Sequence, residues 1–185
     1  MAQIEIVYFS GYGHTVKQAQ AVAAGAGASA RLWRVSDEGT LPEEAWMALD
    51  QADAILFGSP TYMGGPAWQF KRMADESSKR WMTQSWDQKL MGGFTNSAST
   101  NGDKAMTILF FATLAAQHGG LWVSLGQMPA NALASGPEDQ NWSGGALGPL
   151  ATSPSDSTPE QGPLKGDLDS ARAYGERVLS LLSKA

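Results

Sequence analysis

A short loop near the start of the chain combines glycines with hydroxyl side chains, Ser10-Gly11-Tyr12-Gly13-His14-Thr15. Its two glycines allow a tight turn, and the hydroxyls of Ser10 and Thr15 can donate to oxygen atoms. An alanine-rich helical pattern follows, and the first amides of a helix, which lack partners within it, favour an anion. The loop predicts a phosphate site. An ordinary helix start, capped by Ser10 or Thr15, is the alternative that this loop alone leaves open.

Three other phosphate chemistries can be tested on the same residues. A Walker loop requires lysine where this chain has His14, so nucleoside triphosphate hydrolysis is not expected. A dinucleotide fingerprint requires a third glycine where Val16 stands, and only Asp37 is placed to meet a ribose, so that interpretation survives incomplete. A phosphoacceptor receiver domain needs acidic residues after its first and third strands, where this chain has Ser10 and Gly58. No metal site is therefore expected.

Two further loops share this character. Gly58-Ser59-Pro60-Thr61-Tyr62-Met63-Gly64-Gly65-Pro66 offers restricted backbone, hydroxyls, an aromatic ring and a thioether, and Thr95-Asn96-Ser97-Ala98-Ser99-Thr100-Asn101-Gly102 is uncharged and rich in hydroxyls. An isoalloxazine ring needs an apolar or aromatic wall and a few backbone donors and acceptors. Each loop alone also suits a plain strand-to-helix turn. Together with the first loop, they predict an FMN site.

The elements that must position these loops alternate between strand and helix. Short β-branched and aromatic runs predict strands, and apolar residues at a spacing of 3.6 predict helices. We expect strands at 4–9, 31–35, 54–57, 90–94 and 121–123, and helices at 15–24, 42–49, after Pro66, at 105–118 and through Leu168, Ala171, Val178 and Leu182. Such alternation implies a doubly wound α/β fold with a five-stranded parallel sheet and ligands at the carboxyl ends of its strands.

Composition narrows the function further. The chain contains no cysteine, which excludes disulfides, zinc-thiolate sites and iron–sulfur clusters, so redox chemistry must come from a bound cofactor. A net charge of −5 without a basic run argues against a nucleic-acid partner. The N-terminus lacks a signal-peptide pattern, and the apolar stretch 105–116 is too short for a membrane span, so we expect a cytoplasmic protein without membrane insertion.

One segment breaks the alternation. We expect residues 1–185 to form a single domain with a Gly/Pro/Ser-rich insertion at about 126–166, most crowded over 135–167. Composition alone favours a flexible surface excursion. The other interpretation is that the insertion lies near the ligand edge, where Trp142 covers a site or meets another subunit.

Three motifs identify a family that the chain resembles along nearly its whole length. Phe9-Ser10-Gly11-Tyr12-Gly13-His14, Phe57-Gly58-Ser59-Pro60-Thr61-Tyr62-Met63-Gly64 and Leu114-Ala115-Ala116-Gln117-His118-Gly119 are similar to motifs of the flavodoxin-like NAD(P)H:quinone oxidoreductases of the WrbA type. The stretch Gly144-Gly145-Ala146-Leu147-Gly148-Pro149 resembles that family's long insertion. The resemblance implies a flavodoxin-like sheet of order 2-1-3-4-5 and a homo-oligomer, dimer or tetramer, with active sites near subunit junctions.

The resemblance also implies roles for individual residues. FMN would be held by Ser10, Gly11, Tyr12, Gly13, His14, Thr15, Val16, Pro60, Thr61, Tyr62, Met63, Gly64, Asn96, Ser97, Ala98, Ser99, Asn101 and Gln117. Tyr12 would meet the nicotinamide cofactor, and Trp81 and His118 the electron-accepting substrate. Packing is the alternative role for Tyr62, Met63 and Trp81.

Two departures from the family pattern concern the ring. The family usually carries two histidines before the glycine that ends the fourth helix, whereas this chain has Gln117 and His118. Glutamine can hydrogen-bond a flavin or quinone oxygen but cannot take up a proton near neutral pH. Tyr62 also stands where the family usually carries a cation. Both differences bear on the identity of the acceptor.

These observations predict an FMN-dependent oxidoreductase that transfers two electrons from NADH or NADPH to a quinone or a similar acceptor. The flavin carries the chemistry, and no acid–base triad is required. A flavodoxin-type one-electron carrier and a non-catalytic FMN-binding module remain the alternatives. Arg31 and Arg34 do not decide between NADH and NADPH, because both are also explained as solvated strand residues.

Overall fold

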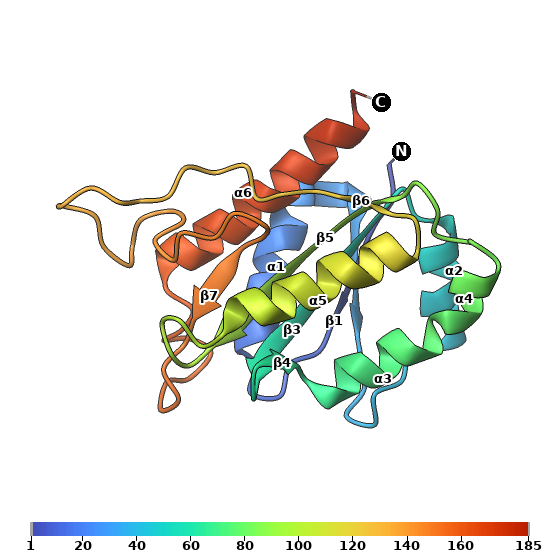
Figure 1. Ribbon diagram of the computed structural model, residues 1–185. Coiled ribbons are helices and arrows are strands. Elements are labelled where there is room, and N and C mark those ends of the chain that lie inside the picture. The colour runs from blue at the N-terminus through green and yellow to red at the C-terminus, as the bar shows by residue number, and fades with distance from the viewer. Residues whose placement is uncertain (1, 185) are drawn as a thin grey trace.

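The computed structural model describes residues 2–184 and has a parallel five-stranded sheet at its centre (Figure 1). The strand order is β2-β1-β3-β5-β6, which confirms the predicted 2-1-3-4-5 order and the flavodoxin-like α/β class. The strands are β1 (Ile4–Tyr8), β2 (Ala30–Arg34), β3 (Ala54–Tyr62), β5 (Leu90–Ser97) and β6 (Leu121–Trp122), with two short additions, β4 (Gly65–Pro66) and β7 (Leu150–Thr152). The helices are α1 (His14–Ala26), α2 (Glu43–Gln51), α3 (Trp68–Glu76), α4 (Ser78–Met82), α5 (Lys104–Gln117) and α6 (Lys165–Leu182), with a 3₁₀ turn, η1 (Gly27–Ser29).

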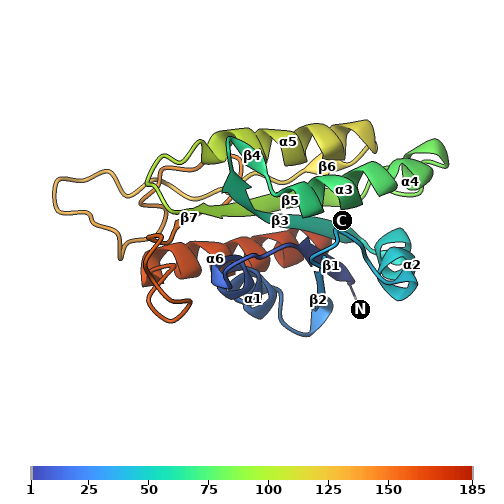
Figure 2. The same cartoon turned by 90° about the horizontal axis from the view of Figure 1, so that it is seen from below.

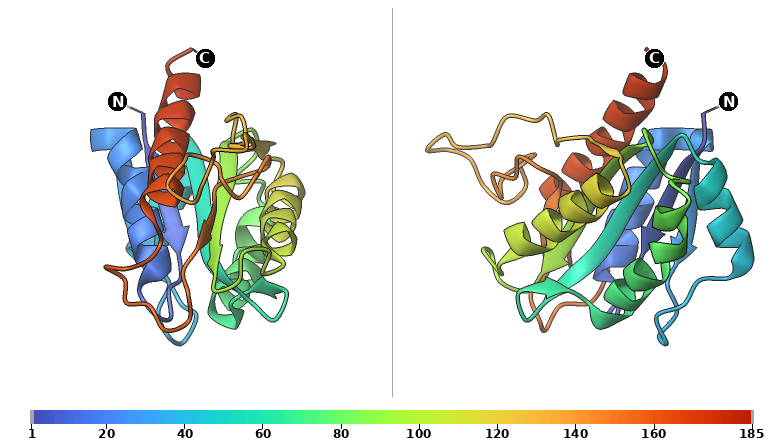
Figure 3. Two further views of the ribbon diagram at one scale, coloured as in Figure 1. Left: turned by 90° about the vertical axis from the view of Figure 1, so that its left-hand side faces the viewer. Right: turned by 45° about the vertical axis from the view of Figure 1, so that its right-hand side comes forward.

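Helices cover both faces of the sheet, as Figure 2 and Figure 3 show. Ile4, Ile6 and Tyr8 of β1 pack into the core on the side of α1 and α6, whereas Val7 packs with α2, α3 and α5 on the other side. Because both faces are covered, the strands read as nearly continuous apolar runs instead of alternating ones. Helices α1 and α6 lie so close that a Cβ on Gly175 would stand 2.0 Å from the carbonyl oxygen of Val22.

Two strands are longer than predicted. Strand β3 continues from 57 to Tyr62, and β5 from 94 to Ser97, so that Pro60 pairs with Asn96. Pro60 is tolerated because β1 has ended beside it. The carbonyl of Gly58 accepts from Phe9, and the backbone groups two residues further on face the same, now open, side. The residues expected as loops are therefore held in strands up to the edge of the sheet.

The insertion contributes to the sheet, which the sequence did not predict. Strand β7 runs parallel to the end of β5, with Leu150 opposite Thr95, while β6 pairs with the start of β5 at Leu90 and Met91. Residues 123–149 leave the sheet between these two strands and project as the golden-orange loop in Figure 1. Within residues 2–184, no helix combines the length and the apolar character needed to cross a membrane.

Candidate functional site

A cavity of about 460 Å³ opens at the carboxyl ends of β1, β3, β5 and β7. It lies where a doubly wound sheet is expected to bind a ligand. The structure brings together most of the predicted site residues there: Ser10, Gly11, Tyr12, His14, Thr15, Pro60, Thr61, Tyr62, Asn96, Ser97 and Ala98. Gly13 directly precedes α1 and Val16 lies in its first turn, but neither residue lines the cavity. Ser99 and Asn101 do not line it either.

The first loop is built to receive an anion. Its Ser10 hydroxyl accepts a hydrogen bond from the Gly13 amide at 3.1 Å, which folds the turn, and Gly13 adopts φ 91°, a conformation that favours glycine. Helix α1 begins at His14 without a side-chain cap and without an acidic residue in its first turn. Its first amides therefore remain available to a phosphate, together with the Thr15 hydroxyl.

Residues 159–162 of the insertion pack against this loop and the first turn of α1. The Nδ1 atom of His14 lies 2.8 Å from the carbonyl oxygen of Gly162, and because a carbonyl only accepts, Nδ1 carries the proton. The ammonium of Lys17 pairs with the carboxylate of Glu160 at 3.7 Å. Pro159 packs so tightly against Gly13 that a Cβ there would meet its ring at 2.7 Å.

Four residues of the insertion line the cavity and were missed by sequence reasoning: Ser153, Pro154, Ser155 and Ser157. The signal was present, since this stretch repeats the hydroxyl-rich character of the three loops. It was hidden by the surrounding Gly/Pro/Ser composition, which favoured a flexible excursion. Trp142, which was expected to cover the site or to meet a partner, is 38% exposed and does not line the cavity.

The second loop supplies aromatic surface. Strands β3 and β4 are joined by a two-residue turn in which Met63 has φ 49° and Gly64 has φ 79°. Met63 is in full solvent contact, and neither Met63 nor Gly64 lines the cavity, so their predicted contact with FMN stays a prediction. The rings of Tyr12 and Tyr62 meet edge to face with centroids 6.4 Å apart. Burial, followed by the neighbouring Tyr12, raises the pKa of Tyr62, which keeps it a neutral hydrogen-bond donor.

The third loop is held by a chain of hydroxyl groups. Thr95 donates to the carbonyl of Ser59, so Thr61, 2.8 Å from it, must donate to Thr95 and accept from Thr107 at 2.8 Å. Beside this chain, Ser153 donates to the side-chain oxygen of Asn96 at 2.9 Å. These hydrogen bonds connect β3, β5, α5 and the insertion and so hold this wall of the cavity in place.

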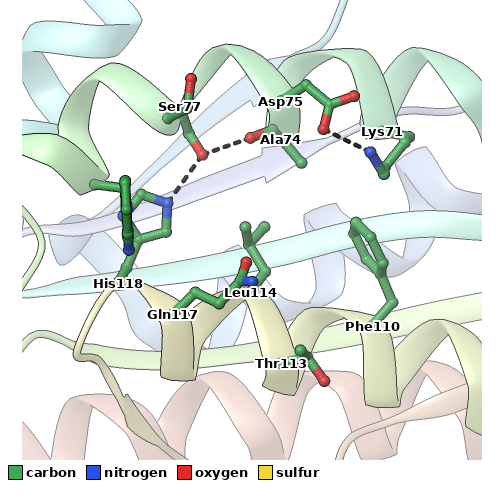
Figure 4. A pocket seen from close by; sticks show the side chains of 11 residues that line it. Lys71, Ala74, Asp75, Ser77, Phe110, Thr113, Leu114, Gln117 and His118 are labelled. Carbon is green, nitrogen blue, oxygen red and sulfur yellow. Dashed lines mark hydrogen bonds and ion pairs between the residues drawn. The ribbon is translucent and has the colours of Figure 1, made fainter.

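The remaining predicted residues, Trp81, Gln117 and His118, lie in a different cavity of about 600 Å³ between α5 and the α3–α4 segment (Figure 4). Helix α5 runs along the sheet for 14 residues, so Gln117 at its end lies about 20 Å from Lys104 at its start, at 1.5 Å per residue. Gln117 therefore does not line the cavity at the carboxyl ends of the strands in its own chain, and its contact with FMN stays a prediction.

His118 is a structural residue within its own chain. The hydroxyl of Ser77 donates to the carbonyl of Ala74 at 2.7 Å, so His118 Nε2, at 2.9 Å, must donate to that hydroxyl. Its Nδ1 has no partner among residues 2–184, and its ring packs on Trp86 with centroids 4.4 Å apart. Burial lowers the pKa of His118, which keeps the ring neutral. With 2% of its surface exposed, it offers little to a substrate in a single chain.

The sequence of this chain is similar to one protein family and to named flavodoxin-like relatives. Residues 10–135 match the family described as NADPH-dependent FMN reductase. The chain is 52% identical over 178 residues to flavodoxin FldP of Pseudomonas aeruginosa (strain UCBPP-PA14), covering 96% of this chain and 95% of the relative. It is 30% identical over 210 residues to NAD(P)H dehydrogenase (quinone) of Geotalea uraniireducens (strain Rf4), covering 98% of each.

A solved structure shows the same relationship in three dimensions. The crystal structure of the flavodoxin, WrbA-like protein from Agrobacterium tumefaciens matches with a TM-score of 0.81 at 47% identity. The match covers 100% of this chain and 99% of that one, so the insertion is included.

Proposed function

The chain belongs to the NADPH-dependent FMN reductase family, as a flavodoxin-like protein of the WrbA type, and from this premise we propose that it transfers two electrons from NAD(P)H to a quinone-like acceptor. One observation carries the proposal. The uncapped start of α1, the Tyr12–Tyr62 pair and residues 96–98 line a single cavity. It joins a phosphate site to a wall suited to an aromatic ring system.

The residues fit FMN. The turn at Gly11 and Gly13 leaves no room for side chains, since a Cβ on Gly11 would stand 2.8 Å from the Tyr62 hydroxyl. The amides of the first turn of α1, with Ser10 and Thr15, would hold the phosphate. Tyr62 and residues 96–98 would border the ring. When bound, the flavin accepts hydride and passes electrons on.

The chain itself contributes binding and orientation. Tyr12, 77% exposed at the rim of the cavity, is available to stack on the nicotinamide of the donor. Segment 153–157 closes the opposite side and restricts access of water. The dipole of α1 and its free amides balance the phosphate charge.

We further propose that Trp81 and Gln117 serve the reaction from a second copy of the chain, because they lie in the other cavity of their own chain. This composite site can be tested with hybrid oligomers. Gly11→Asp subunits should lose FMN through repulsion of its phosphate, and Gln117→Ala subunits should bind FMN but react slowly. Mixed oligomers should regain activity, because the Gly11→Asp subunit supplies Gln117 to its neighbour. Hybrids no more active than the parents would contradict shared sites.

The main proposal is tested by purifying the protein, recording its visible spectrum and identifying the released flavin. Oxidation of NADH and of NADPH is then followed with and without benzoquinone. We expect a yellow protein that contains FMN and shows acceptor-dependent turnover. A colourless protein that does not take up added FMN would overturn the proposal, and a yellow protein without acceptor-dependent turnover would support a non-catalytic module.

A flavodoxin-type electron carrier is the second candidate, because a relative with 52% identity is named a flavodoxin. A carrier docks proteins through a strongly charged face, and a net charge of −5 over 185 residues is modest for that purpose. Reductive titration separates the two functions. Uptake of electrons one at a time without direct NAD(P)H oxidation favours the carrier, and uptake in pairs favours the oxidoreductase.

A further inference from the structure

A buried lysine lies directly behind the wall of the cavity. Lys104 is the first residue of α5 and is 1% exposed. Its ammonium donates to the Ser97 hydroxyl at 3.0 Å, to the Ser99 carbonyl at 3.0 Å and to the Thr152 hydroxyl at 2.9 Å. All three of its protons are therefore used.

These three bonds join two walls of the site. Ser97 lines the cavity at the end of β5, and Thr152 is the last residue of β7, immediately before the cavity residue Ser153. Lys104 thus fixes the third loop and the insertion relative to each other. A neutral amide nitrogen donates at most two hydrogen bonds, so an ammonium is the group that satisfies all three acceptors, and its charge then has to be accommodated.

The charge of Lys104 is poorly compensated. Lysine is rarely buried unless it is paired, yet no ion pair within 4.0 Å among residues 2–184 includes Lys104. Its place at the start of α5 is also unfavourable for a cation, because the helix dipole is positive there. Burial lowers the pKa of Lys104 to about 8, so the side chain is still charged at neutral pH.

One carboxylate lies in the same region. Asp167 of α6 accepts from the Thr152 amide at 2.8 Å and opposes the fall of the Lys104 pKa. Burial raises the pKa of Asp167 to about 6, and Glu138 of the insertion acts in the same direction. Asp167 is thus the charged group that acts on Lys104 from a neighbouring segment, and Glu138 acts on Asp167. An anion in the cavity would add the compensation that Asp167 leaves incomplete.

We propose that Lys104 is a positioning residue of the flavin wall whose buried ammonium also favours the reduced, negatively charged ring over the oxidised, neutral ring. The inference rests on the proposed function as an FMN protein. At pH 7, hydride transfer from NAD(P)H brings two electrons and one proton to the ring and leaves NAD(P)⁺. The ring thereby gains one negative charge, and a nearby cation stabilises that charge.

The test compares the two-electron midpoint potential of bound FMN in three variants, each of which removes one charge. Lys104→Gln should lower the preference of the protein for reduced over oxidised FMN by about tenfold, which is about 30 mV toward negative potential. Asp167→Asn, which retains an oxygen to accept from Thr152, should shift the potential toward positive values at pH 7. Lys184→Gln, at an exposed position near the C-terminus, should leave it unchanged.

An electrostatic effect shifts the midpoint potentials of Lys104→Gln and Asp167→Asn in opposite directions. Loosening of the wall would shift both potentials in the same direction. If Lys104→Gln does not fold, the sign of the Asp167→Asn shift decides alone. A second readout is the pKa of Lys104, followed by NMR of its side-chain nitrogen, which should rise when FMN binds. Bound FMN with unchanged potentials, or with shifts of the same sign, would overturn this inference while leaving the proposed function intact. A wild-type protein that binds no FMN would overturn both.

Discussion

Replacement of Gly13 by alanine tests the contact between the phosphate loop and the insertion. The new Cβ would stand 2.7 Å from the Cγ of Pro159 and would also occupy a backbone conformation with φ +91°. Gly144 is the matched control. It lies in the same insertion at φ +68°, is exposed, and has nothing within 4 Å of an added Cβ. The two substitutions therefore share backbone strain and differ in the clash with Pro159.

The magnitudes follow from these contacts. Alanine at positive φ costs about 1–2 kcal/mol, which both variants should lose. In Gly13→Ala, the clash should push Pro159 away and break the His14–Gly162 hydrogen bond. The loss of this bond should lower the free energy of unfolding of Gly13→Ala by about 1 kcal/mol more than that of Gly144→Ala. Urea unfolding of the FMN-free proteins measures this difference. Because segment 153–157 lines the cavity, we also expect FMN to bind about five- to tenfold more weakly, as measured by quenching of flavin fluorescence.

Equal losses of stability in Gly13→Ala and Gly144→Ala, with unchanged affinity for FMN, would refute this reasoning. The insertion would then rest on the phosphate loop without stabilising it. A loss of affinity with equal stabilities would instead place the effect in the loop geometry alone.

Three further predictions concern buried polar groups. Tyr174→Phe removes the hydroxyl that donates to the Val123 carbonyl at 2.6 Å, and the free energy of unfolding should fall by about 1–3 kcal/mol in urea titrations. Thr61→Val interrupts the hydroxyl chain between Thr107 and Thr95, with a similar expected loss, whereas equal stability would show that the chain is dispensable. The pKa of His118 is lowered in the folded state, so unfolding takes up a proton as pH falls below about 6.5, and wild-type stability should fall there more steeply than that of His118→Gln. Parallel pH profiles of these two proteins would contradict the buried neutral histidine.

The fold was predictable because its signals are local. Apolar runs buried on both faces and helices with a 3.6-residue period establish the order of elements, and the order of elements establishes the sheet. The ends of β3 and β5 were not predictable in the same way. Gly58, Pro60 and the polar run from Thr95 favour loops, and only pairing with distant segments holds them as strands.

The same distinction between local signals and long-range pairing applies to the residues of the candidate site. The loops at Ser10, Pro60 and Asn96 converge because parallel strands end at one edge, which the sequence implies. Gln117 stands at the far end of a helix that begins beside the site, so it lines the other cavity of its own chain, which motif resemblance alone could not show. The contribution of Ser153 depends on β7, a three-residue strand too short to show a pattern.

Two short strands, β6 and β7, share the place beside β5 at the edge of the sheet, and this arrangement has a consequence for engineering. Trp122 lies opposite Met91 and Leu150 opposite Thr95, four positions further along β5, which spans about 13 Å at 3.3 Å per residue. A few residues would bridge that distance, whereas the chain uses all of 123–149. The excursion therefore starts and finishes on one neighbouring strand and acts as a module whose length can be altered. Doubling it should cost only about 0.6 kcal/mol in closure entropy, so its exposed part around Leu133 is a suitable place to graft a reporter domain.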